Sequence, residues 1–288
     1  MANVLLLRAP TQGQDDRYEA TFTEAGYHPL SVPVLETIST NLEILEGIVE
    51  AGPSKNNLEG VVLTSARACE AWESVVGELT GASIDKRNDD WSSVPFYVVG
   101  PGTASVLEEV RRTYGQTPYT PQVICGQSSG TGERLAQFIR DQPEGKPKKL
   151  LYLTGDKNKD TVPSILGEAG IELLSLKVYE TQGSRTFQRD LEHALGWAST
   201  ELERWWIVHF APSAAGFVTP ILNNHFDFES AEPDTERSIS RPRVAAIGPV
   251  TAAFLRDELK IRVDATSSKP TPEDLLAAIV AHDQASGP

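Results

Sequence analysis

One six-residue element occurs twice in this chain and constrains its fold more than any other feature. Residues 98–103 read VVGPGT and residues 246–251 read AIGPVT, and each copy joins an apolar run to a segment with helical apolar spacing. A glycine and a proline at such a junction are typical of a tight turn that enters a helix. The unpaired N–H groups of a helix start favour an anion. The repetition therefore predicts two similar anion-binding turns.

The spacing of other elements extends this repeat over most of the chain. Gly26 and Gly170, each a helix stop, are 144 residues apart, and the same number separates Thr37 from Thr181, which end two extended segments. Within each copy, apolar runs alternate with helix-like segments. This alternation indicates an α/β protein with parallel sheets and helices on both faces.

Four segments carry more specific structural expectations. Residues 28–37 are predicted to form an extended exit strand despite Pro29 and Pro33, and residues 261–263 a weak last strand. The polar inserts 80–93 and 229–242 are expected to be surface loops.

Composition limits the classes of partner. The chain has 288 residues and a formal net charge of −14, which argues against a nucleic-acid partner. It lacks a basic region followed by an apolar core at its start, and it has no apolar run of 18 residues, so we expect a soluble, cytoplasmic protein without a membrane partner. Cys69 and Cys125 match no metal spacing and fit a reducing compartment.

Two glycine-rich segments resemble cofactor-binding motifs, but neither motif is complete. Residues 100–105 nearly match the dinucleotide fingerprint but end in Ser105, and the glycine-rich residues 126–132 lack the Lys-Ser/Thr pair of a phosphate-binding loop. His209, inside an apolar strand, is expected to be a hydrogen-bonded core residue rather than a metal ligand. We therefore expect no cofactor and no metal.

Five segments in a fixed order resemble one known family. They are residues 63–68 (LTSARA), 99–104 (VGPGTA), 178–181 (VYET), 246–252 (AIGPVTA) and 272–275 (PEDL). Their order and spacing resemble uroporphyrinogen-III synthases over nearly the whole chain.

The resemblance implies two flavodoxin-like parallel-sheet domains joined by a two-stranded antiparallel linker. One domain would be discontinuous, made of residues 1–35 and 184–288, and the other would comprise residues 38–180. The linker strands would be residues 33–38 and 176–183. The active site would lie in the cleft between the domains.

The resemblance also implies a reaction. A family member is a cofactor-independent lyase of haem biosynthesis that cyclises hydroxymethylbilane to uroporphyrinogen III, with inversion of ring D and loss of water. The implied partner is this small-molecule substrate, and the implied protein is a monomer.

The resemblance also implies site residues, by their positions in the matching segments. Tyr179 matches the family's linker-strand tyrosine, which is proposed to assist departure of the hydroxyl group; packing between domains is the structural alternative. Thr103 and Thr251 match threonines at helix starts that bind substrate, with N-capping as the alternative. Ser65 and Ser213 match cleft-lining positions, with capping of a turn as the alternative.

Three further residues complete the predicted substrate-binding set. Lys159 and Gly155 follow a strand, and the lysine resembles a basic family residue that would pair with a substrate carboxylate. Arg8 ends the first strand, where parallel sheets bind ligands. The chain departs from the family at Ala211, where a hydroxyl residue is frequent, so the backbone amides near Ser213 become the candidate donors.

Two other classes of function compete with the synthase. A two-lobed binding module that closes on a small anion without chemistry has the same architecture, and product analysis distinguishes it. A nucleotide-dependent α/β enzyme is disfavoured by the glycine-rich segments already rejected.

Overall fold

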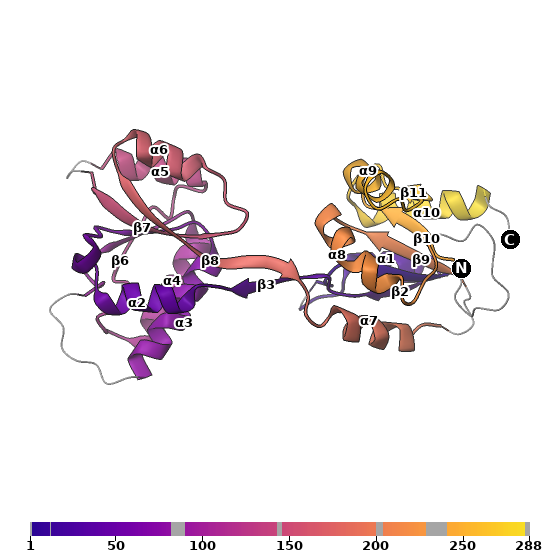
Figure 1. Ribbon diagram of the computed structural model, residues 1–288, viewed down its shortest axis with the longest axis horizontal. Helices are drawn as coiled ribbons and strands as arrows, with labels where there is room; N and C mark the ends of the chain where they lie inside the picture. The colour runs from indigo at the N-terminus through magenta and orange to yellow at the C-terminus, as the bar shows by residue number, and fades with distance from the viewer. Residues whose placement is uncertain are drawn as a thin grey trace. The chain divides into compact units, whose positions relative to one another are not determined.

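The chain divides into two compact units. The computed structural model describes residues 2–11, 13–81, 90–142, 146–199, 204–228 and 241–285. Unit 1 comprises Met1–Glu36 and Gln182–Pro288, and unit 2 comprises Thr37–Thr181 (Figure 1). The chain therefore passes from unit 1 to unit 2 once and returns once.

Unit 1 contains a five-stranded sheet in the order β11-β10-β9-β1-β2, and all of its strand pairs are parallel. Its strands are β1 (Asn3–Leu7), β2 (His28–Ser31), β9 (Trp205–His209), β10 (Arg243–Ala246) and β11 (Ala265–Thr266). Its helices are α1 (Arg17–Glu24), α7 (Phe187–Gly196), α8 (Pro212–Leu222), α9 (Pro249–Asp257) and α10 (Pro272–Ala285).

Both faces of this sheet are covered. Leu5 and Leu7 of β1 belong to a core cluster with residues of α7 and α8, whereas Val4 and Leu6 share a second cluster with residues of α1 and α10. Successive strand side chains point to opposite faces, so an all-apolar strand requires helices on both sides.

Unit 2 contains a six-stranded sheet in the order β3-β8-β7-β4-β5-β6. Its strands are β3 (Leu35–Ser39), β4 (Val61–Leu63), β5 (Pro95–Val98), β6 (Val123–Cys125), β7 (Lys149–Gly155) and β8 (Glu172–Gly183). Its helices are α2 (Leu42–Ala51), the 3₁₀ turn η1 (Ser54–Asn56), α3 (Ala66–Gly81), α4 (Pro101–Tyr114), α5 (Gly132–Arg140) and α6 (Thr161–Glu168).

The same two-sided packing organises unit 2. Val61 and Leu63 of β4 pack in a cluster with residues of α2, α3 and α4, and Val62 between them packs in a cluster with residues of α5 and α6. Figure 1 shows α5 and α6 on one side of this sheet and α2, α3 and α4 on the other. The predicted fold class, parallel α/β sheets with helices on both faces, is confirmed.

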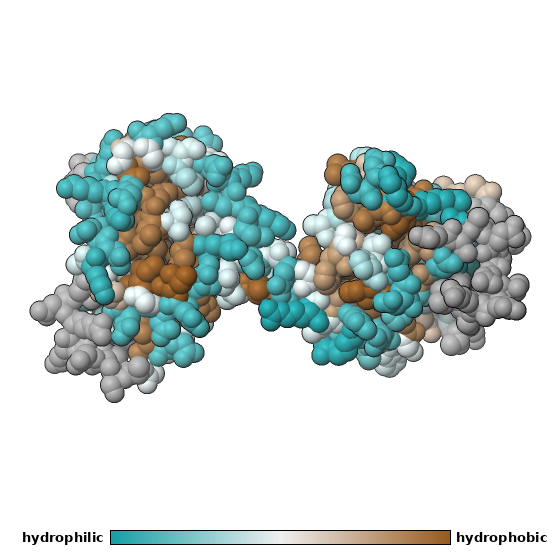
Figure 2. Space-filling view, viewed as in Figure 1, coloured by the Kyte–Doolittle hydropathy of each residue, from teal (hydrophilic) through white to brown (hydrophobic). Residues whose placement is uncertain are grey.

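Strands β3 and β8 carry the chain between the units and pair with each other. The N–H of Thr40 donates to the Val178 carbonyl at 2.9 Å, and the N–H of Ser184 donates to the Val34 carbonyl at 2.8 Å. Residue numbers rise on one strand as they fall on the other, so the pair is antiparallel. Figure 2 shows hydrophilic residues over much of the visible face of each unit.

The expected exit strand at residues 28–37 is two strands rather than one. β2 ends at Ser31 and β3 begins at Leu35. The Val32 N–H still donates to the Leu6 carbonyl of β1, whereas Val34 already accepts from Ser184. The break occurs where the chain changes partners, at a proline that has no N–H to donate.

The last predicted strand is misplaced. Residues 261–263 are irregular, and the strand is β11, Ala265–Thr266. Lys260 has a φ of 58°, and the Ile261 N–H donates back to the Leu255 carbonyl at 2.9 Å. Lys260 and Ile261 therefore close the turn that follows α9, because a left-handed residue after a helix turns the chain back on the last turn.

The expectation of a surface loop at residues 80–93 is wrong at both ends. Thr80 and Gly81 belong to α3, and Trp91 is 0% exposed. The Trp91 indole N–H donates to the Val49 carbonyl at 2.9 Å, and its ring contacts Trp72 edge to face. Residues 82–89 of this insert, and 229–240 of the second, lie outside the described residues.

Candidate active site

A cavity of about 430 Å³ opens at the edge of the unit 2 sheet where its parallel strands end. This is the edge at which open α/β sheets bind ligands. Residues from the ends of β4, β7 and β8 and from the starts of α5 and α6 line it: Thr64, Ser65, Thr131, Gly132, Glu133, Tyr152, Lys157, Asn158, Lys159, Thr161, Val162 and Tyr179. The cavity is large enough for part of a ligand with several rings.

Tyr179 enters this cavity through an irregularity in the sheet. Thr154 pairs with Lys177, but the next residue, Gly155, pairs with Tyr179, so Val178 is the extra residue of a bulge. Val178 is buried in the core, and the Tyr179 ring lies over Gly155, where an added Cβ would be 2.3 Å from the ring. Bulges redirect side chains near functional sites. Gly155 therefore has a positional reason to be glycine.

Ser65 both caps a helix and lines the unit 2 cavity. Its Oγ accepts a hydrogen bond from the Ala68 N–H at 3.2 Å, which caps α3, and the residue also lines the cavity. Since a hydroxyl oxygen that accepts one bond can still donate, capping leaves the Ser65 proton available to a ligand.

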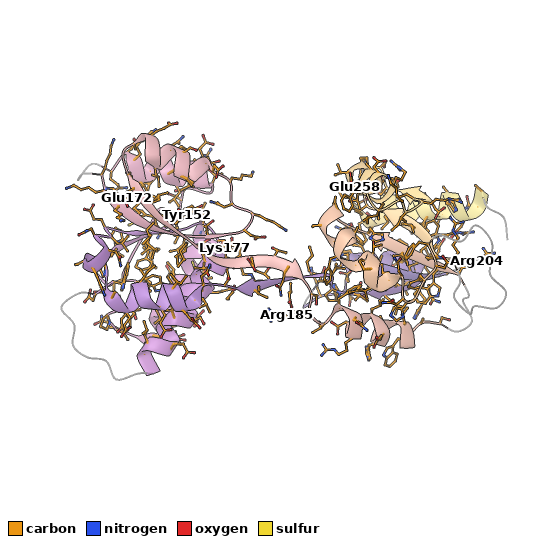
Figure 3. The ribbon with its side chains drawn as sticks, viewed as in Figure 1. Tyr152, Glu172, Lys177, Arg185, Arg204 and Glu258 are labelled. Atoms are coloured by element: carbon orange, nitrogen blue, oxygen red, sulfur yellow. The ribbon has the colours of Figure 1, made fainter. Side chains whose placement is uncertain are left out.

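Lys159 lies in the loop between β7 and α6, together with Lys157 and Asn158. Both lysines are exposed, and neither has a salt-bridge partner within the described part of the chain. The hydroxyl of Tyr152, on β7 (Figure 3), donates to the Asn158 Oδ1 at 2.8 Å. Within the described residues, the loop thus presents two lysine ammonium groups at the cavity without a salt-bridge partner.

The two repeated turns have the same geometry in their separate units. Gly100 and Gly248 are the N-cap residues of α4 and α9, and neither helix has a side-chain cap. Each helix begins with a proline, and its first backbone bond runs from residue 104 to 100 or from 252 to 248, at 3.0 Å in both cases. Two N–H groups per turn therefore stay outside the intrahelical pattern.

This geometry overturns the capping alternative for Thr103 and Thr251. Each threonine is the third residue of its helix and is largely buried, at 8% and 4% exposure. Thr103 does not line the cavity described above. At both positions, the backbone N–H is one of the two groups that precede the first intrahelical bond, which makes it a candidate anion donor within the described chain.

Arg8 follows β1 at the corresponding edge of unit 1 and is held by a buried carboxylate. Its guanidinium donates to Asp16 at 2.8 Å and stacks over the Tyr18 ring at 4.8 Å. Burial would raise the pKa of Asp16, but hydrogen bonds from the Thr11 N–H and from Arg8 outweigh it and hold this pKa well below its usual range. Asp16 also caps α1. Arg8 is thus firmly oriented, with its charge compensated.

Ser213 is exposed at the start of α8, where Ala211 is the N-cap without a side-chain bond. Pro212 precedes it, so this helix repeats the proline entry of α4 and α9. Since Ala211 has no polar side chain, the backbone N–H of Ser213 is the candidate donor at this helix start.

His209 is buried as expected, at 1% exposure, but it is not hydrogen-bonded. Neither ring nitrogen has a partner among the residues that the structure describes. Burial lowers its pKa to about 3.

Of the predicted site residues, the unit 2 cavity brings together Ser65, Lys159 and Tyr179, with Gly155 beneath the tyrosine ring. Arg8, Ser213 and Thr251 follow the ends of strands in unit 1. The sequence interpretation missed Asn158, Lys157 and Thr131. Lys157 could have been found from the sequence, because it lies two residues before Lys159 in the same loop. Asn158 could not, because its bond to Tyr152 depends on the fold.

The fold and the site together define a class: a parallel α/β protein in two units, with uncapped, proline-entered helix starts and, among the described residues, lysines without a salt-bridge partner where its strands end. A family profile described as "Uroporphyrinogen-III synthase HemD" matches residues 16–277. The chain belongs to the uroporphyrinogen-III synthase family.

Named relatives match the chain over nearly its full length. It is 28% identical to the uroporphyrinogen-III synthase of Saccharomyces cerevisiae, across 96% of this chain and 94% of the yeast protein. It is 27% identical to that of Schizosaccharomyces pombe, across 99% of this chain and 98% of the relative. The family assignment therefore covers both units.

Solved structures of two bacterial proteins also match. The uroporphyrinogen-III synthetase of Helicobacter pylori has 15% identity and a TM-score of 0.46, covering 98% of this chain and all of that chain. A mutant Thermus thermophilus uroporphyrinogen III synthase has 17% identity and a TM-score of 0.41, covering 99% of this chain and all of that chain. Among the described residues, the helices are too short or too polar to span a bilayer.

Proposed function

We propose that this chain cyclises hydroxymethylbilane to uroporphyrinogen III, with loss of water and inversion of ring D. The observation that carries the proposal is the family match, which extends through both units rather than through one domain. We further propose a monomeric cytoplasmic enzyme that needs no cofactor. The thiols of Cys69 and Cys125 are both free, which suits a reducing compartment.

The first chemical step would be the departure of the hydroxyl group. The pyrrole nitrogen of ring A supplies the electron pair as the C–O bond breaks, and the phenol of Tyr179 supplies a proton, so the group leaves as water. A protonated azafulvene remains on ring A, because its nitrogen keeps the N–H proton. A tyrosine hydroxyl in a partly enclosed cavity is suited to this transfer.

The later steps would depend on orientation. The substituted α-carbon of ring D attacks the azafulvene and forms a spiro-pyrrolenine, which opens and closes again with ring D reversed. The last proton leaves ring D as its pyrrole is restored. Without guidance the free end of ring D reacts first and gives the type I isomer, so the protein must hold the bent conformation.

Substrate carboxylates would supply that orientation. In unit 2 we propose Lys159, Ser65 and the N–H groups beside Thr103 as ligands, and in unit 1 Arg8, Ser213 and the N–H groups beside Thr251. Lysine charges and helix-start amides favour carboxylates without a cofactor. Under this proposal each unit supplies ligands for substrate carboxylates from the ends of its own strands.

The test is a product analysis. Hydroxymethylbilane is generated enzymatically in the assay, the protein is added, and the uroporphyrin isomers are separated after oxidation. We expect the type III isomer to dominate when protein is present and the type I isomer without it. Type I alone in both samples contradicts the proposal and leaves the non-catalytic binding module as the better interpretation.

A Lys159→Ala variant is expected to raise KM about 5-fold and to change kcat by less than about 2-fold. An exposed lysine that pairs with a substrate carboxylate contributes roughly 1 kcal/mol, which corresponds to this change. Lys55→Ala, on η1 of the same unit, is the matched control because Lys55 is also exposed but does not line the cavity. Equal KM values for the two variants would remove Lys159 from the site.

A further inference from the structure

The unit 2 cavity contains a contact that the proposed mechanism does not use. We infer that Asn158 binds a substrate carboxylate through its side-chain amide, and that Tyr152 is the positioning residue that orients this amide. The identity of the ligand rests on the proposed function. The arrangement of the two side chains does not.

Tyr152 lies in the core of the sheet and can hold the loop between β7 and α6 in place. It is 1% exposed and lies in the interior of the sheet, paired with Val62 of β4 on one side and with Ser175 of β8 on the other. Its hydroxyl donates to the Asn158 Oδ1 at 2.8 Å. This bond fastens the exposed loop between β7 and α6 to the core of the sheet.

The bond also determines which atoms of the Asn158 amide remain available to a ligand. Since Oδ1 accepts the tyrosine proton, the Nδ2 group keeps its two N–H donors, and Nδ2 has no partner in the described ranges of the chain. Asn158 lines the cavity between Lys157 and Lys159, which have no carboxylate partner there either. An amide N–H and an ammonium group side by side can bind the two oxygens of one carboxylate.

The cavity wall also limits where the carboxylate can bind. Glu133 is the one carboxylate among the cavity-lining residues, and its Oε1 accepts a weak bond from Gln137 on α5 at 3.5 Å. A substrate carboxylate would be repelled by Glu133 and attracted by the two lysines. The proposed subsite therefore comprises the loop that Tyr152 holds and excludes Glu133 on α5.

Asn158→Asp is the sharpest test because it is nearly isosteric. The new carboxylate can still accept the Tyr152 proton, but it loses both N–H donors and repels a substrate carboxylate. We expect KM to rise about 10-fold and kcat to change by less than about 2-fold, with the same thermal midpoint. Tyr152→Phe frees the loop but keeps the amide, so we expect a smaller rise in KM, about 3-fold, again with little change in kcat.

Tyr97→Phe is the matched control. Tyr97 is a buried tyrosine in the same core cluster as Tyr152, and it does not line the cavity. It should keep the wild-type KM. Wild-type KM values for both Asn158→Asp and Tyr152→Phe overturn the inference. If Tyr152→Phe fails to fold, Asn158→Asp still decides.

A binding measurement separates this inference from the proposed reaction. Uroporphyrin III, the stable oxidised form of the product, is titrated into the protein and its Kd is measured from quenching of tryptophan fluorescence. A Kd that rises about 10-fold in Asn158→Asp supports the subsite even if no type III isomer is formed. A Kd unchanged by the substitution, or a wild-type protein that neither binds the porphyrin nor forms the isomer, overturns it.

Discussion

Replacing Tyr179 by phenylalanine is expected to lower kcat about 100-fold and to leave the free energy of unfolding within about 1 kcal/mol of wild type. General acid catalysis by one positioned group contributes roughly 10²–10⁴-fold. The ring packs against the unit 2 core, and phenylalanine keeps this contact. Single-turnover rates of type III isomer formation and denaturant unfolding measure the two quantities. Wild-type turnover would leave the tyrosine as a packing residue.

Gly155→Ala tests the same hydroxyl without removing it. The added Cβ would lie 2.3–2.8 Å from ring and hydroxyl atoms of Tyr179, so the ring must move. A displacement of about 1 Å at a reacting group can cost up to about 100-fold, and we expect kcat to fall at least about 10-fold. Gly167→Ala, an exposed position on α6 with nothing within 4 Å of its added Cβ, is the control. It should keep the wild-type rate.

The second large effect concerns acid stability and His209. Burial lowers the pKa of this side chain from 6.5 to about 3 in the folded protein. Below pH 6.5 the unfolded chain binds a proton that the folded chain does not, so stability falls as pH decreases from about 6.5 towards 3. One pKa unit corresponds to about 1.4 kcal/mol, so the loss is about 2 kcal/mol at pH 5.

Urea unfolding at pH 7.5, 6 and 5 measures this dependence. A His209→Leu variant has no proton to gain at this position, and we expect its stability to vary much less over that range. His225→Leu keeps His209 and should follow the wild-type curve. If His209→Leu loses as much stability at pH 5 as the wild type, another group is responsible. The window lies above the range in which Asp16 would contribute, because the ordinary pKa of 3.8 and the lowered folded pKa of this carboxyl group are both below pH 5.

The alternation of apolar and helical runs was sufficient to predict the layered α/β fold. Both faces of each sheet had to be covered, and strands such as residues 61–63 are apolar throughout. The prediction of strands was wrong where a short apolar run does not pair in a sheet. Residues 261–263 are apolar at two of three positions, but the left-handed Lys260 before them makes them part of the irregular segment that follows α9.

The site was predictable where position along a strand determines location. Ser65, Lys159 and Tyr179 each follow or lie near the end of a parallel strand, so they meet at one edge. The helix-start threonines were correctly placed on helices, but the proline and glycine before them move the cap to residues 100 and 248. The bulge at Val178 and the Tyr152–Asn158 bond depend on tertiary pairing, which no local pattern encodes.

The pairing of β3 with β8 has a consequence for how such a chain is assembled. Unit 2 is one uninterrupted segment, and its two ends are adjacent because Thr40 is hydrogen-bonded to Val178. The two segments of unit 1 that precede and follow unit 2 are also adjacent, since Ser184 is hydrogen-bonded to Val34. Unit 2 is thus an insertion in a second, otherwise ordinary fold, of the kind that tolerates excision and circular permutation. A short turn in its place would reconnect the host domain with its strand order intact.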